Sequence, residues 1–121
     1  MYAKSYKELD IYKNSYNLAL KVHKLSLGLP KIEQYGEGSQ LRRTSKSIVS
    51  NIVEGFGRKR YKKELIKFLT YALASSDETK LHLDFIYDCG YINKNIHNEF
   101  DKKYEYLGRQ IYNLIESVDN I

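Results

Sequence analysis

The feature that most constrains the fold is a set of apolar residues near the end of the chain, which recur at steps of three and four. They are Ile96, Phe100, Tyr104, Leu107, Ile111, Leu114 and Val118. This spacing repeats on one face of an α-helix and does not fit the alternation of a strand. Asn93 or Asn95 stands just before the set and is a suitable N-cap. The pattern therefore predicts a helix over residues 94–118 with one buried face.

Three earlier segments show the same period and predict helices over residues 7–27, 39–55 and 62–89. Proline removes a backbone donor and glycine readily adopts left-handed dihedrals, so Pro30, Gly55 and Gly90 are expected to lie at helix ends. The expected core of the second helix is Leu41, Ser45, Ile48 and Ile52. That of the third is Leu65, Phe68, Leu69, Ala72, Ser76, Thr79, Leu83, Ile86 and Tyr87. Four tyrosines fall on predicted core faces, namely Tyr12, Tyr16, Tyr87 and Tyr104.

Four amphipathic helices with short connections predict an all-α, up-down-up-down four-helix bundle. A length of 121 residues with 42% apolar content suits one domain over residues 1–121. The first helix has two apolar faces. One consists of Leu9, Tyr12, Tyr16, Leu20 and Leu27, and the other of Ile11, Leu18, Val22 and Leu25. Surplus apolar surface favours a homo-oligomer, with a thicker monomer core as the alternative.

The sequence shows neither a secretory signal nor a membrane-spanning segment. Residues 1–8 have no apolar run after their charges, and no stretch approaches the length of a membrane span. We therefore expect a soluble cytoplasmic protein that has no membrane partner. Cys89 is the single cysteine, which excludes an internal disulfide, and it is predicted to be a small buried residue near a helix end.

Positive charge is concentrated in the first half of the chain. Residues 1–67 hold fifteen Lys and Arg against six Asp and Glu, whereas residues 68–121 hold five against nine. Lysine and arginine attract phosphates, and an exposed tyrosine can stack on an unpaired base. The predicted nucleic-acid-binding residues are Arg42, Arg43, Lys46, Arg58, Lys59, Arg60, Tyr61, Lys62, Lys63 and Lys67. The alternative is a solvated helix face, although cations at a helix N-terminus oppose the helix dipole.

The basic residues form two groups along the sequence. Arg42, Arg43 and Lys46 lie within the second helix, and the others follow its end. The first group therefore belongs at the far end of that helix, and an oligomer would be needed to bring the groups together.

No pattern of a catalytic, metal or cofactor site is recognisable. A di-iron bundle needs Glu followed three residues later by His, and that spacing does not occur. Glu78 and His82 are four residues apart, but one carboxylate and one imidazole do not make a metal site. Gly55-Phe56-Gly57-Arg58 lacks the ending of a phosphate-binding loop and follows a helix. We expect no metal, no cofactor and no enzymatic activity.

Several motifs resemble those of a known family. In the second helix they are Gln40-Leu41-Arg42-Arg43, Ser47-Ile48 and Asn51-Ile52-Val53-Glu54-Gly55-Phe56-Gly57-Arg58. In the third they are Lys63-Glu64-Leu65-Ile66-Lys67-Phe68-Leu69, Ala72-Leu73-Ala74-Ser75 and Glu78, followed by Gly90-Tyr91-Ile92. The chain resembles the four-helix-bundle proteins encoded in 23S rRNA intervening sequences. It is similar also to the accessory proteins of diversity-generating retroelements, which associate with a reverse transcriptase.

The resemblance implies a bacterial bundle that assembles as a cyclic homopentamer, without established enzymatic activity, and binds RNA or DNA. The function expected from the residues and the resemblance together is a non-enzymatic, basic, homo-oligomeric nucleic-acid-binding accessory protein. The alternative is a scaffold that docks an acidic partner such as a reverse transcriptase. The expected ligand is either RNA or DNA, and the sequence does not distinguish them.

Overall fold

Four long helices make up most of the chain in the computed structural model, which describes residues 3–121. Helix α1 spans Asp10–Leu27, α2 spans Glu37–Gly57, α3 spans Lys62–Asp88 and α4 spans Lys94–Asp119. Short 3-10 turns at Tyr6–Glu8 and Lys31–Glu33 precede α1 and α2. The described range contains no strand, so the prediction of an all-helical chain with four helices is confirmed. Within that range, no helix is long and apolar enough to cross a membrane.

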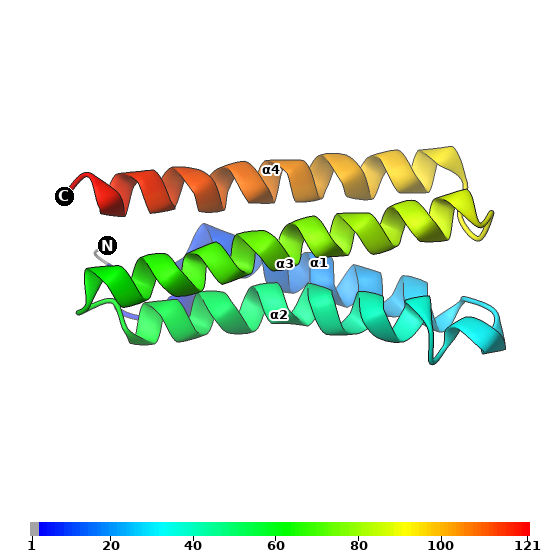
Figure 1. Ribbon diagram of the computed structural model, residues 1–121, viewed down its shortest axis with the longest axis horizontal. Coiled ribbons are helices and arrows are strands. Elements are labelled where there is room, and N and C mark those ends of the chain that lie inside the picture. The colour runs from blue at the N-terminus through cyan, green and yellow to red at the C-terminus, as the bar shows by residue number, and fades with distance from the viewer. Residues whose placement is uncertain (1–2) are drawn as a thin grey trace.

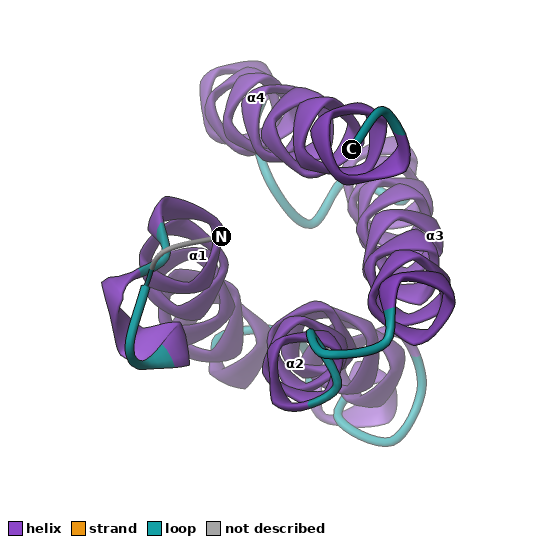
Figure 2. Ribbon diagram, turned by 90° about the vertical axis from the view of Figure 1, so that its left-hand side faces the viewer, coloured by secondary structure: helices purple, strands orange, loops and turns teal. Residues whose placement is uncertain are grey.

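The helices alternate in direction along the chain. Figure 1 shows both termini and the α2–α3 connection at one end, with the α1–α2 and α3–α4 connections at the other. Figure 2 views the bundle from the end that carries the termini. The most extensive packing joins α2 to α3, followed by α1 with α2 and α3 with α4, while α1 and α4 touch least. The ring of helices is therefore most loosely closed between α1 and α4.

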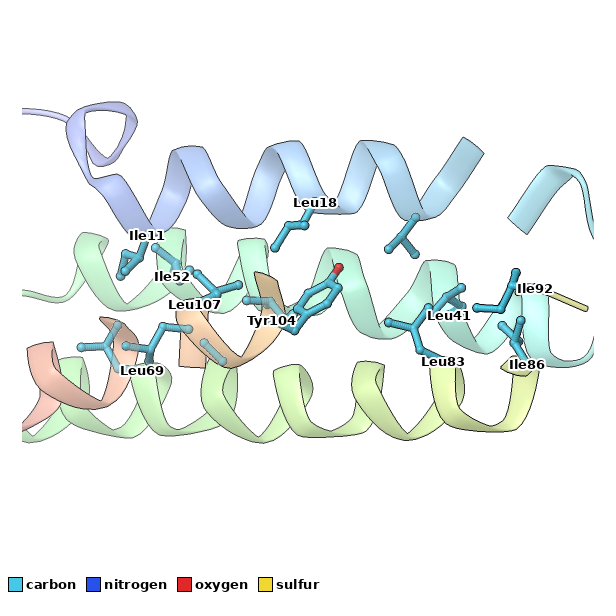
Figure 3. Close-up of a cluster of buried hydrophobic side chains, with 14 of the residues drawn as sticks. Ile11, Leu18, Leu41, Ile52, Leu69, Leu83, Ile86, Ile92, Tyr104 and Leu107 are labelled. Carbon is cyan, nitrogen blue, oxygen red and sulfur yellow. The ribbon is translucent and has the colours of Figure 1, made fainter. Parts of the chain in front are cut away.

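The core runs along the bundle between these helices (Figure 3). Leu41, Ile48 and Ile52 of α2 face Leu69, Leu83 and Ile86 of α3, with Tyr104, Leu107 and Ile111 contributed by α4. Most of these side chains are inaccessible to solvent, as expected from their three- and four-residue spacing. Buried Thr44 and Thr79 join α2 to α3 through a hydroxyl hydrogen bond of 3.0 Å. The predicted core faces of α2 and α3 are therefore largely confirmed.

The buried face of α1 is not the face that carries Tyr16. Buried α1 residues are Ile11, Ser15, Leu18, Ala19, Val22 and Ser26, whereas Tyr16, Leu20 and Leu27 are exposed. Ser15, Ala19 and Ser26 complete the buried face, but these small residues give little hydrophobic signal. The face that carries Tyr16, Leu20 and Leu27 therefore looked equally suitable for the core. The prediction of a buried Tyr16 is wrong.

One predicted helix end and the predicted burial of Cys89 also differ from the structure. Gly55 lies inside α2 and is buried there, because α3 passes so close that a Cβ at this position would come 3.2 Å from Phe68 Cβ. Its predicted role as a helix stop is wrong. Gly90 behaves as expected: it has φ +83° and follows α3, and the Tyr91 N–H donates to the Ile86 carbonyl over 3.0 Å. Cys89 does lie at this helix end, but it is exposed because the chain turns there, so its predicted burial is wrong.

Candidate nucleic-acid interface

The predicted basic residues occupy opposite ends of α2. Arg42 and Arg58 are sixteen residues apart, which corresponds to about 24 Å along a helix that rises about 1.5 Å per residue. Arg42, Arg43 and Lys46 lie toward the α1–α2 connection, and residues 58–67 lie at the end that carries both termini (Figure 1). One subunit therefore does not unite the two groups into one patch.

Arg42 is partly buried and its guanidinium serves the α1–α2 connection. Nη1 donates to Ser26 Oγ over 2.8 Å, and Nη2 donates to the Gln34 backbone carbonyl over 2.6 Å. The Gln34 side-chain amide in turn donates to the carbonyls of Ser26 and Leu29, each at 2.9 Å. Carbonyls at the end of a helix lack intrahelical donors, and these contacts supply them. The placement of Arg42 is thus explained without a ligand.

Arg43 belongs to a polar network between α2 and α3. Its Nη2 lies 2.7 Å from Glu78 Oε2, in an ion pair that is largely exposed. The same carboxylate oxygen lies 3.9 Å from His82 Nε2, and His82 Nδ1 lies 2.7 Å from Glu37 Oε2. Within residues 3–121, no three His, Cys, Asp or Glu side chains gather as a metal site. Glu78 and His82 therefore act as connections between helices.

Lys46 is exposed on α2, where its ammonium lies 3.0 Å from His23 Nδ1 of α1. This contact joins two helices without involving a carboxylate. Lys46 lies far from residues 58–67, toward the other end of α2.

At the other end of α2, Arg58 is held by two carboxylates. Its Nε lies 3.3 Å from Glu54 Oε2 and its Nη1 lies 3.0 Å from Glu64 Oε1. The hydrogen bond with Glu54 raises the pKa of Arg58, and Glu64 adds to this. The guanidinium also lies 4.8 Å from the centre of the Phe68 ring. Arg58 thereby joins the end of α2 to the start of α3.

Three of the lysines in this segment also have partners within the protein. Lys67 pairs with Glu64 over 3.2 Å. The Lys59 ammonium lies 4.0 Å from the centre of the Phe56 ring and donates to the Ala3 carbonyl. The Lys62 ammonium donates to the carbonyls of Asp119 and Ile121 over 2.9 and 3.1 Å. A cation at this position interacts favourably with the negative end of the α4 dipole and satisfies the last carbonyls of that helix.

Arg60, Tyr61 and Lys63 remain exposed, and no side-chain hydrogen bond or ion pair engages them within the described chain. Tyr61 is the N-cap of α3 by its backbone, without a capping side-chain bond, and its side chain is 63% exposed. Arg60 lines a shallow pocket of about 360 Å³ between the start of α3 and the end of α4. The exposed N–H groups that begin a helix favour an anion. This end of the bundle can therefore receive a phosphate, with an aromatic ring beside it.

A third group of cations, which the charge pattern along the sequence did not reveal, consists of Lys21 on α1 and Lys102 and Lys103 on α4. The adjacent lysines of α4 were visible in the sequence as a basic pair within the acidic half. Lys21 comes beside them only through the antiparallel packing of α1 and α4. The spacing of residues along the chain does not predict this proximity.

Comparison with known proteins agrees with this architecture. A search of curated proteins found no match. Among solved structures, a protein of unknown function from the S23 ribosomal protein family of Bacteroides thetaiotaomicron superposes with a TM-score of 0.80 at 20% sequence identity. The superposition covers 88% of this chain and 95% of the other. The model of a family described as 23S rRNA-intervening sequence protein matches residues 7–113. This chain therefore belongs to the 23S rRNA-intervening sequence protein family.

Proposed function

We propose that this protein is a non-enzymatic homo-oligomer that binds the phosphate backbone of RNA or DNA through the end of the bundle where α3 begins. The observation that carries the proposal is the exposure of Arg60, Tyr61 and Lys63 without side-chain partners inside the described chain. The other cations of this segment contact carboxylates, carbonyls or aromatic rings of the fold, whereas Arg60 and Lys63 do not. An anionic ligand would compensate the repulsion between Arg60, Lys63 and the helix dipole.

A homo-oligomer is supported by apolar side chains that the bundle leaves in solvent. Tyr16, Leu20 and Leu27 follow one face of α1, and Leu81 and Phe85 lie on α3, each about half exposed. A cyclic homopentamer, as the family resemblance implies, would cover such faces and repeat the basic end five times. Light scattering in solution should give five times the mass of the chain. A monomer at all concentrations would contradict this part of the proposal.

The test of nucleic-acid binding is a salt titration with a fluorescent single-stranded RNA. For each phosphate neutralised, the logarithm of the association constant should fall by about 0.7 per log unit of salt. Arg60→Glu/Lys63→Glu should weaken binding about tenfold or more and reduce this slope. The matched control is Lys31→Glu/Lys94→Glu, which makes the same charge change at two exposed lysines outside the segment.

If the control weakened binding as much as the test variant, net charge and not this surface would be responsible. Absence of binding at low salt would refute nucleic-acid binding itself. The scaffold alternative, in which the same cations dock an acidic protein such as a reverse transcriptase, would then be preferred. Direct measurement of that association with both double variants distinguishes the two.

A further inference from the structure

The loosely packed side of the bundle carries a groove that is separate from the basic end. This α1–α4 groove has a volume of about 380 Å³ and is open to solvent on one side. Its polar walls are Asn14, Asn17 and Lys21 of α1, and Lys102, Lys103 and Tyr106 of α4. Figure 2 shows these two helices facing each other across the widest separation in the ring. A side-chain hydrogen bond joins them, in which Asn14 Nδ2 donates to Gln110 Oε1 over 2.8 Å.

Positive charge in the groove exceeds what the surrounding residues neutralise. Lys103 pairs with Glu99 over a distance of 2.8 Å, so one ammonium has a carboxylate. Lys21 lies against Lys103, and this neighbour lowers the pKa of Lys21. Within residues 3–121, neither Lys21 nor Lys102 has a carboxylate within 4.0 Å. The groove therefore keeps two cations whose charges are not balanced by close contacts.

This arrangement does not help the bundle to fold. The ammonium groups of Lys21 and Lys103 lie against each other and repel, and this repulsion acts between the two neighbouring helices that share the least packing. Placed apart on the surface, the same lysines would solvate the protein without this cost. An anion bound in the groove beside Lys21 and Lys102 would replace this repulsion by attraction and join α1 to α4.

The remaining walls of the groove suit the rest of a nucleotide. Tyr106 is 59% exposed, so one face of its ring is accessible for stacking on a base. Asn17 is exposed and supplies both amide donors and a carbonyl acceptor, which can bind ribose hydroxyls or a base edge. Leu18 is buried beneath and provides an apolar floor. Cations, an aromatic ring and amides thus line one concave surface.

We propose that the α1–α4 groove binds a nucleoside phosphate, with the phosphate held by Lys21 and Lys102 and the base stacked on Tyr106. The ligand is a free mononucleotide or one nucleotide of a single strand, since both present the same groups. The site uses none of the residues at the basic end, so it stands whether or not that end binds nucleic acid.

The test measures binding of adenosine monophosphate to the full chain by calorimetry, with inorganic phosphate as the comparison ligand. Lys21→Glu/Lys102→Glu should weaken binding of the nucleotide about tenfold or more. Lys21→Glu also places a carboxylate beside Lys103, so this variant is expected to fold. Tyr106→Leu should weaken nucleotide binding about 5- to 100-fold and leave phosphate binding unchanged. Lys31→Glu/Lys94→Glu is the matched charge control and should bind like the wild type.

A second arm uses single-stranded RNA and identifies the source of the nucleotide. If RNA binding depends on Lys21 and Lys102 while the free nucleotide binds weakly, the ligand is a nucleotide within a strand, and the proposal holds. Arg60→Glu/Lys63→Glu should leave mononucleotide binding unchanged, which separates this site from the basic end. The proposal is overturned if Lys21→Glu/Lys102→Glu alters neither ligand, or if the control alters both to the same extent.

Discussion

Replacement of Arg42 by Gln tests whether this residue serves the fold or a ligand. The variant loses charge-assisted hydrogen bonds to Ser26 Oγ at 2.8 Å and to the Gln34 carbonyl at 2.6 Å. A hydrogen bond to a charged group contributes about 1.5–3 kcal/mol, and partial exposure argues for the low end of that range. We therefore expect the free energy of unfolding to fall by about 2–4 kcal/mol. With a urea m-value of about 2 kcal/mol per molar, the midpoint should fall by about 1–2 M.

The assay is urea unfolding followed by circular dichroism, with Arg60→Gln as the control. Arg60 has no side-chain partner in the described chain, so its replacement should change stability by less than about 0.5 kcal/mol. Nucleic-acid binding by the folded proteins should show the opposite order, with the Arg60 variant affected more. An Arg42 variant that keeps its urea midpoint but loses affinity for RNA would refute the reasoning.

Three further changes test separate parts of the structure. Gly90→Ala adds a Cβ at φ +83°, so the unfolding free energy should fall by about 1 kcal/mol, and an unchanged melting temperature would contradict the left-handed turn. Tyr104→Phe removes a buried hydroxyl without a partner in residues 3–121, so urea unfolding should show equal or greater stability, by up to about 1 kcal/mol. A clear loss would mean that the hydroxyl is satisfied. Lys67 and then Arg58 lower the pKa of Glu64, so its stabilisation exists above the ordinary pKa and disappears as the pH falls through the lower folded-state value. Glu64→Gln should be less stable than the wild type at about pH 7, and the difference should vanish well below about pH 4.3, whereas a difference independent of pH would refute the ion pairs.

The helices could be predicted because hydrophobic periodicity is a local property. Leu41, Ile48 and Ile52 are large, apolar and regularly spaced, and they are inaccessible in the fold. The buried face of α1 was less readable, because it is completed by Ser15 and Ser26, whose hydroxyls bond to their own helix at Tyr12 and His23. A polar residue satisfied in this way enters a core without a hydrophobic signal.

The candidate site could be predicted only in outline. The density of positive charge along the chain predicted a basic surface at residues 58–67. The sequence does not reveal which of these cations form contacts within the protein. Lys62 is adjacent to Lys63 in sequence, yet it binds the end of α4 while Lys63 remains exposed. Such differences arise from contacts with segments more than fifty residues away, which only the assembled bundle defines.

The light packing between α1 and α4 has a kinetic consequence. Nearly all interhelical packing joins helices that follow each other along the chain. Proteins whose contacts are local in sequence have low contact order and fold quickly, in the microsecond to millisecond range for helical bundles. The chain can assemble by adding each helix to its predecessor, without first closing a long loop. It follows that α1 or α4 can detach while the α2–α3 hairpin persists, so amide exchange should be slowest at the centre of that hairpin.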